Sequence, residues 1–153
     1  MAGLLPALQG GLMASAGSDW RIAILRPGGD PIGNLARALS SPAVLGSQDA
    51  EQKGADMQAV MTETTLRRSS LGLAELVRRA RTKLDADGQP FFPDYENLLV
   101  VVDQFEELFR FKQLIEEEKS QEDAAAFVKL LLGAVGQKTE KIYVVLTMRS
   151  DFL

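Results

Sequence analysis

Apolar residues recur in two patterns along the chain, and together they predict alternating strands and helices. Continuous apolar runs of strand composition occupy Trp20–Leu25, Asn97–Val102 and Lys141–Thr147. Apolar residues at helical spacing instead fall within residues 4–12, 31–39, 73–84, 106–118 and 124–135. Continuous hydrophobicity indicates strands that are covered on both faces. The pattern therefore predicts an α/β fold, with Asn97–Val102 as the central strand of a parallel sheet and helices on both of its faces.

Two of the predicted helices carry end signals. Asp30 stands where a helix N-cap belongs, and Pro31 suits the first helical position. Ser120 followed by Asp123 predicts the cap of a later helix, and Gly136 is suited to end it. These signals place helix starts directly after Asp30 and Ser120.

The segments between these elements are predicted to be connections. Residues 40–65 are polar and interrupted by proline and glycine, so we expect a long connection with one helical turn near Met57 to Met61. Residues 85–93 are expected to form a turn. The basic run from Arg78 to Lys83 falls late in its helix, where cations complement the helix dipole, and we interpret it as a solvated helix face.

Composition adds limits to this picture. The 153 residues, 46% hydrophobic and 25% charged, are typical of one globular domain. With 17 basic against 21 acidic residues, the net charge of -4 disfavours nucleic acid and anionic membranes as partners. No apolar run reaches the roughly 20 residues of a membrane-spanning helix. We therefore expect a cytoplasmic protein.

The chain contains neither cysteine nor histidine. Their absence excludes disulfides, thiolate nucleophiles, zinc sites with thiolate or imidazole ligands, and mechanisms of the Ser-His-Asp or Cys-His type. Chemistry in this chain must use carboxylates, arginine, lysine, hydroxyls, backbone amides or an oxygen-bound metal.

Acidic residues follow the central predicted strand, where functional residues of open α/β sheets cluster. Asp103 ends the run Asn97–Val102, a position that can hold Mg²⁺ through water, although a helix N-cap is an alternative role. Glu106 and Glu107 lie within a turn of the same strand end. Both also suit the first turn of a helix, which is at least as good an account of Glu107. The pattern does not decide between the two roles for Glu106.

Arginines follow the other two strands. Arg149 comes after the strand that ends near Leu146, and its guanidinium could bind an anionic ligand at the same edge or pair with Asp151. Arg26 precedes Pro27 in a sequence that is common in turns, so we interpret it as structural rather than functional.

These residues match a known family. The segment Leu99–Phe109 resembles the Walker B segment of the novel STAND NTPases, which are signal-transduction ATPases with numerous domains. Segments similar to other parts of that family, in the same order, are Ala2–Leu8, Arg26–Pro31 and Leu146–Leu153. The resemblance implies that residues 1–153 belong to a P-loop NTPase domain, with a parallel sheet flanked by helices, that acts as an ATP-binding signalling switch.

The resemblance also implies roles for single residues. Asp103 would organise Mg²⁺, with Gln104 beside it at the ATP site. Glu106 or Glu107 would lie near the attacking water, and Arg149 near the terminal phosphate. Gln104 stands where many related ATPases have a glutamate, and an amide orients water without taking its proton, so slow hydrolysis is expected.

One part of the family pattern is missing. The P-loop, Gly-x-x-x-x-Gly-Lys followed by Ser or Thr, occurs nowhere in these 153 residues. We therefore expect a partial NTPase core without the P-loop strand, which binds ATP weakly or not at all by itself. In the family that strand lies beside the sensor strand, so Ile142 to Leu146 would form an apolar edge open to self-association or to other protein domains.

Two other readings of the chain remain open. One is a non-enzymatic α/β interaction module that has lost nucleotide binding. The other is a doubly wound domain, similar to response regulators, that uses Asp103 without nucleotide.

Overall fold

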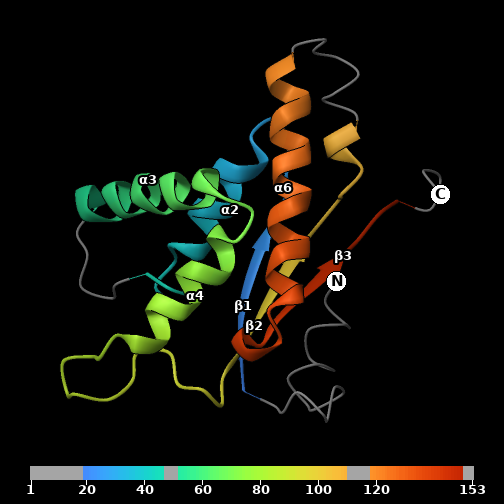
Figure 1. The fold of residues 1–153 in the computed structure, drawn as a ribbon. Coiled ribbons are helices and arrows are strands. Elements are labelled where there is room, and N and C mark those ends of the chain that lie inside the picture. Colours follow the sequence, from blue (N-terminus) through green and yellow to red (C-terminus); the bar gives the residue numbers. More distant parts are fainter. Residues whose placement is uncertain (1–18, 47–51, 110–117, 150–153) are drawn as a thin grey trace.

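Three parallel strands lie side by side at the centre of the structure (Figure 1). The computed structural model describes residues 19–46, 52–109 and 118–149. The strands β1 (Trp20–Leu25), β2 (Asn97–Val102) and β3 (Ile142–Leu146) pair in the order β1-β2-β3. Every residue of β2 is buried, as expected for the predicted central strand. The predicted α/β fold with a parallel sheet is confirmed.

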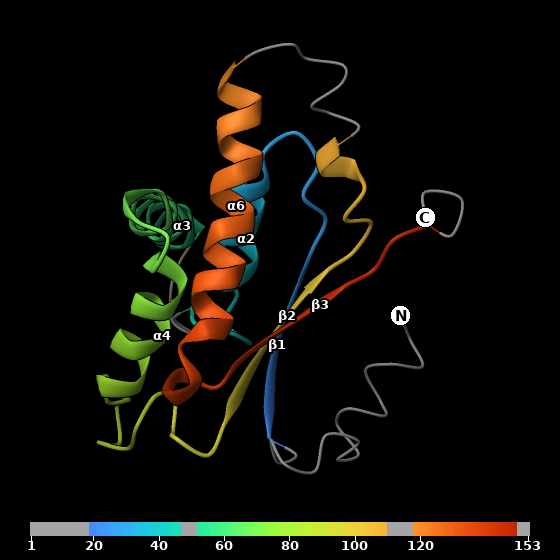
Figure 2. The ribbon, with the colours of Figure 1, turned by 45° about the vertical axis from the view of Figure 1, so that its right-hand side comes forward.

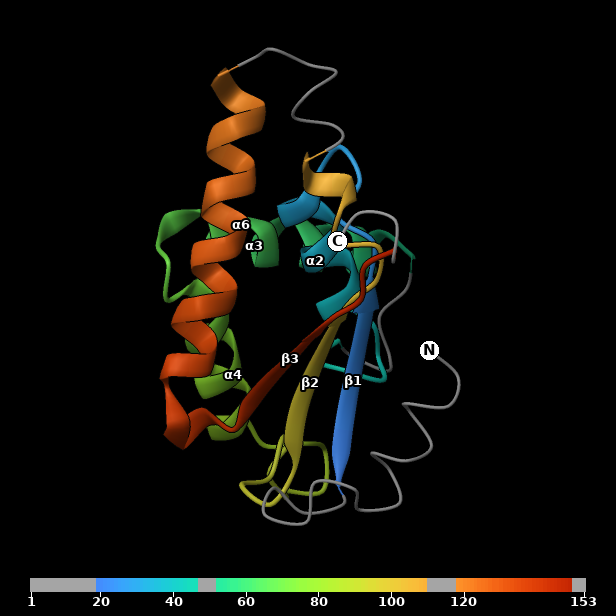
Figure 3. The same cartoon turned by 90° about the vertical axis from the view of Figure 1, so that its right-hand side faces the viewer.

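Helices flank this sheet. They are α2 (Pro31–Leu39), α3 (Gln52–Arg68), α4 (Gly72–Thr82), α6 (Glu118–Gly136) and the short 3-10 helix η2 (Lys138–Glu140). In the described part of the chain α2, α3, α4 and α6 all lie on one side of the sheet (Figures 2 and 3), so helices on both faces are not seen. The helix expected within residues 4–12 lies outside the described residues. No helix of the described residues is long and apolar enough to cross a membrane.

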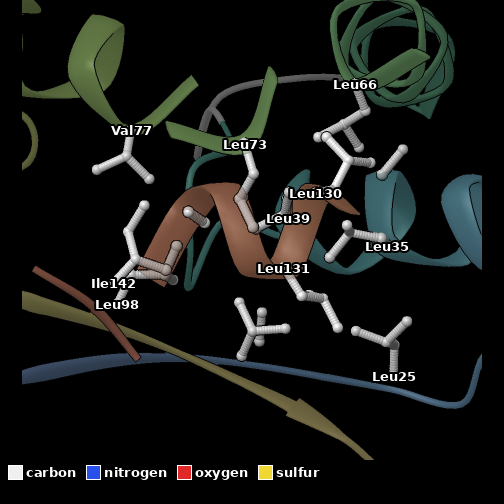
Figure 4. Packing of buried hydrophobic residues seen from close by; sticks show 14 of the residues in the cluster. Leu25, Leu35, Leu39, Leu66, Leu73, Val77, Leu98, Leu130, Leu131 and Ile142 are labelled. Atoms are coloured by element: carbon white, nitrogen blue, oxygen red, sulfur yellow. The ribbon is translucent and has the colours of Figure 1, made fainter. Parts of the chain in front are cut away.

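The main hydrophobic core lies between the sheet and the helices. Alternate residues of β2 point into it, namely Leu98, Val100 and Val102. Figure 4 shows Leu98 near Ile142 at the sheet side of this core, with Leu131 of α6 above the strands. Each fully buried leucine of this kind stabilises the fold by roughly 1.5–3 kcal/mol. The other two apolar residues of β2, Leu99 and Val101, pack in a smaller cluster on the opposite face.

The predicted helix signals are confirmed at two positions and wrong at two. Asp30 caps α2 by accepting a hydrogen bond from the Gly33 amide at 3.1 Å, and α6 ends at Gly136 as expected. Ser120 and Asp123 lie inside α6 and do not precede it. The carboxylate of Asp123 instead pairs with an arginine of α3 at 3.1 Å.

Helix α3 replaces most of the connection predicted for residues 40–65, and that prediction is wrong. Its apolar residues do not form one buried stripe, because only Leu66 among its large apolar residues is buried. The exposed ones are Met57, Val60 and Met61. Packing against α2 and an ion pair between Glu63 and Arg67 at 2.9 Å stabilise a helix that apolar spacing does not reveal.

The basic run after residue 77 is not one solvated face. The side chain of Arg81 is only 7% exposed, and its guanidinium donates hydrogen bonds to the carbonyls of Pro93, Glu96 and Glu140 at 2.6–3.1 Å. It also stacks on the ring of Phe92 at 4.2 Å. Burial lowers the pKa of Arg81, while neighbouring carboxylates act in the opposite direction. The prediction is therefore wrong for Arg81, although the other three cations of the run are exposed.

Helix α4 ends earlier than predicted, whereas the turn after it forms as predicted. The helix stops at Thr82, so Leu84 lies beyond it and is exposed. The predicted turn over residues 85–93 is confirmed. Asp85 holds it by accepting hydrogen bonds from the amides of Asp87 and Gln89, both at 2.9 Å.

Candidate functional site

The carboxyl ends of the three strands meet at one edge of the sheet, where backbone hydrogen bonds join them. The amide of Asp103 donates to the carbonyl of Leu25 at 2.8 Å, which ties the end of β2 to β1. The amide of Thr147 donates to the carbonyl of Val102 at 3.0 Å. The amide of Phe105 donates to the carbonyl of Thr147 at 2.8 Å. The turn after β2 is thus fixed from both neighbouring strands.

Thr147 orients the side chain of Asp103. Its hydroxyl lies 2.7 Å from Asp103 Oδ1 and 3.1 Å from the backbone nitrogen of Gln104. Because a backbone N–H can only donate, the hydroxyl accepts from Gln104 and gives its own proton to the carboxylate. The second oxygen, Oδ2, has no protein donor among the described residues, so half-buried Asp103 keeps one oxygen for a ligand.

This arrangement suits a hydrated cation better than a cage of protein ligands. The described residues contain no group of three or more carboxylates that could hold a metal ion. Mg²⁺ is commonly held by one or two carboxylates while it keeps several waters, and Asp103 fits that role. In the alternative role of helix cap, Asp103 would accept from the amide of Phe105 or Glu106. Among the described residues neither amide donates to Asp103, and that of Phe105 donates to the carbonyl of Thr147 instead.

Gln104 adopts a left-handed backbone conformation with φ of 55°. For a residue with a Cβ this conformation costs about 1–2 kcal/mol. Its side-chain oxygen Oε1 accepts a hydrogen bond from Arg26, which follows β1. Contacts from two strand ends therefore hold Gln104: Thr147 at its backbone and Arg26 at its side chain.

Glu107 is tied to the loop after β1. Its Oε1 lies 3.2 Å from the guanidinium of Arg26, and its Oε2 accepts a hydrogen bond from the amide of Gly28 at 3.2 Å. Residues 107–109 form a helical turn, as predicted, and residues 110–117 lie outside the described residues. Both oxygens of Glu107 are thus occupied by protein donors.

Glu106 has the opposite environment. Its side chain is only 1% exposed, and neither carboxylate oxygen has a hydrogen-bond partner among the described residues. A buried polar group without a partner is costly, and such groups occur where function or a missing partner explains them. Glu106 is therefore the acid of this turn that is least explained by structure alone.

Arg149 lies three positions beyond the end of β3 and is exposed. This places it past the carboxyl end of the sheet, on the side of β3. Asp151, its predicted partner, lies outside the described residues.

The structure brings together Asp103, Gln104 and Glu107 of the predicted site residues. It adds Thr147, which the sequence pattern does not single out as a site residue, and Arg26, for which the pattern favours a structural role. A signal existed for both residues. Thr147 follows β3 and Arg26 follows β1 in the way that Asp103 follows β2.

The fold and this edge define an α/β domain whose central parallel strand ends in an oriented carboxylate. The family model described as Novel STAND NTPase 1 matches residues 1–153, the whole chain. The chain belongs to this family, and the resemblance noted in the sequence is confirmed. No curated protein and no solved structure matches the chain.

Proposed function

We propose that this chain forms part of an ATP-binding signalling switch and supplies the magnesium side of its nucleotide site. The observation that carries this proposal is the hydrogen bond from Thr147 to Asp103, which leaves one carboxylate oxygen at the carboxyl edge of the sheet. Family membership supports the same reading. The proposed cofactors are ATP and Mg²⁺.

The residues of the edge take distinct roles in this proposal. Asp103 would contact Mg²⁺ through its waters, and Arg149 would lie near the terminal phosphate. Of the two glutamates, Glu106 would be the acid near the attacking water, because both oxygens of Glu107 are held by Arg26 and Gly28. Gln104 cannot take a proton from water, so slow hydrolysis suited to a switch follows.

The phosphate cradle is a separate part of the site. No P-loop sequence occurs in the 153 residues, so the cradling amides and the phosphate lysine would come from residues outside this sequence. We infer that this chain by itself binds Mg-ATP weakly, with a Kd of about 1 mM or above, because one half of the contacts is missing.

Nuclear magnetic resonance titration tests this function directly. Mg-ATP added to ¹⁵N-labelled chain should shift the amide resonances of Asp103, Gln104 and Thr147, and the shifts should shrink when Mg²⁺ is removed. Amides on the far side of the domain, such as Gly88 in the turn after α4, serve as the control. If no resonance of the edge moves, the nucleotide-binding proposal is refuted.

A protein-interaction role is the second candidate, and β3 provides its support. β3 is an edge strand of the described sheet, and Leu146 at its end is 46% exposed. A groove of about 330 Å³ between the turn after β2 and α6 is almost wholly apolar. Its apolar lining residues are Leu108, Phe109, Ala124, Ala125 and Val128. Unpaired edges and apolar surface favour pairing with another chain or domain.

Light scattering distinguishes this candidate. We expect the chain to self-associate at micromolar concentration through β3, and Leu146→Lys should weaken this because an edge lysine opposes strand pairing. Leu132→Lys, at an equally apolar and 64% exposed position of α6, is the matched control. If light scattering shows the wild-type chain to be a monomer at this concentration, edge pairing is contradicted.

A further inference from the structure

Arg26 connects two residues of the turn after β2. Its guanidinium donates to Oε1 of Gln104 and lies 3.2 Å from Oε1 of Glu107. The two acceptors are three positions apart in sequence, and both belong to the proposed nucleotide site. One arginine that follows β1 thereby holds the side chains at both ends of this short turn.

The backbone beneath Arg26 is itself anchored. The side-chain amide of Asn34, on α2, donates to the carbonyls of Arg26 and Pro27 at 3.1 and 2.9 Å. Gly28 has a φ of 54°, which favours glycine, and its amide holds the second oxygen of Glu107 at 3.2 Å. Helix α2 therefore fixes the position from which Arg26 reaches the turn.

The contact with Arg26 decides how the Gln104 amide is oriented. A guanidinium has only donors, so the atom of Gln104 that faces it must be the carbonyl oxygen. The other end of the amide is then the NH₂ group, which can only donate. On the side away from Arg26, the Gln104 side chain therefore presents only its NH₂ group, which can donate two hydrogen bonds to a ligand and accept none.

We propose that Arg26 is a positioning residue that turns the side-chain amide of Gln104 into a hydrogen-bond donor for phosphate oxygens. This inference rests on the proposed nucleotide-binding function and specifies one contact of that site. It gives Gln104 a role toward the anionic ligand, in addition to its backbone contact with Thr147. Arg26 acts through Gln104, and its charge is largely matched by Glu107.

A ligand-free measurement tests the positioning step. In Arg26→Met, the side-chain NH₂ resonances of Gln104 should shift in ¹⁵N spectra, because Arg26 holds that amide. The amide resonance of Gly28 should also shift, because Gly28 donates to Glu107, which Arg26 contacts as well. Arg79→Met is the matched control, since Arg79 has the same 57% side-chain exposure and pairs with Glu75 on α4. Unchanged Gln104 resonances in Arg26→Met would overturn the proposal.

A charge-preserving variant separates position from charge. Lysine keeps the positive charge, but its side chain ends one atom short of Nη2, the single Arg26 nitrogen that contacts both acceptors. If Arg26 acts by positioning, Arg26→Lys should weaken Mg-ATP binding about as much as Arg26→Met, roughly tenfold for one lost hydrogen bond to a charged group. Wild-type affinity in Arg26→Lys would show that only the charge matters and would overturn the proposal.

A double-mutant cycle tests whether Arg26 acts through Gln104. Gln104→Met removes the amide at similar length and should also cost roughly tenfold in Mg-ATP affinity. Adding Arg26→Met to this variant should cause no further loss. Additive losses would mean that Arg26 contacts the ligand directly, against the proposal.

The same titration distinguishes this inference from the proposed function. In the wild-type chain, Mg-ATP should shift the side-chain NH₂ resonances of Gln104 together with the backbone resonances of Asp103 and Thr147. If only the backbone resonances move, the nucleotide site stands and the donor role of Gln104 falls. If none of them moves, both proposals fail.

Discussion

Thr147 and Asp103 lie 44 positions apart in the sequence, yet the threonine hydroxyl donates a hydrogen bond to Oδ1 of the aspartate over 2.7 Å. This bond links the ends of β3 and β2 at the edge where the proposed ligand would bind. It also fixes which carboxylate oxygen remains for that ligand. The proposed metal site therefore depends on Thr147, an uncharged residue that orients the carboxylate of Asp103.

Replacement of the threonine hydroxyl tests this dependence. Thr147→Val keeps the shape but leaves Asp103 without its donor and the Gln104 amide without its acceptor. We expect a loss of about 1–3 kcal/mol in the free energy of unfolding, measured in urea, because two partly buried polar groups, one of them a carboxylate, lose their hydrogen-bond partner. Thr147→Ser retains the hydroxyl and is the control. Equal stabilities of the two variants would show that the bond contributes nothing.

Removal of the Asp103 charge tests the proposed metal contact. Asp103→Asn keeps an oxygen that can accept from Thr147, but it loses the charge that attracts Mg²⁺. We expect the resonance shifts caused by Mg-ATP to require roughly tenfold more ligand, a change of about 1.4 kcal/mol. Exposed Glu122 on α6 provides the control Glu122→Gln. The difference between wild type and Asp103→Asn should vanish in excess EDTA; if it persists, Asp103 does not act through a metal.

The two neighbouring glutamates should respond oppositely to the same substitution. Glu106→Met replaces a buried carboxyl group without hydrogen-bond partners by an apolar side chain of similar length, so we expect the free energy of unfolding to rise by about 1–2 kcal/mol. Glu107→Met removes a pair with largely exposed Arg26 and should lower the free energy of unfolding by less than about 1 kcal/mol. Urea unfolding of both variants measures the difference. Destabilisation by Glu106→Met would mean that its carboxyl group has a stabilising partner.

The sequence predicts the sheet well, because three continuous apolar runs each produce one strand. It predicts α3 poorly, since packing on α2 and the pair between Glu63 and Arg67 are contacts that no apolar period records. At the site, Asp103 is found from its place after a strand. The contacts of Arg26 and Thr147 depend on strand order and register, which bring together residues 78 and 43 positions from Gln104.

Arg81 shows the same limit of sequence reasoning, and its removal has a testable cost. Its position in a basic run suggests solvent, but the folded chain uses it to satisfy three backbone carbonyls that lie between α4 and the ends of β2 and η2. Arg81→Met leaves these acceptors without their donor while keeping apolar contact with Phe92.

We therefore expect Arg81→Met to lower the free energy of unfolding by about 2–4 kcal/mol, since three partly buried acceptors lose a charged donor. Arg78→Met, three positions earlier and 60% exposed, removes only a pair with Glu140 and should cost less than about 1 kcal/mol. Urea unfolding of the two variants under identical conditions provides the comparison. Similar losses of unfolding free energy in both variants would contradict the proposed role of Arg81 as donor to the three carbonyls, because the two side chains differ chiefly in where their guanidinium groups lie.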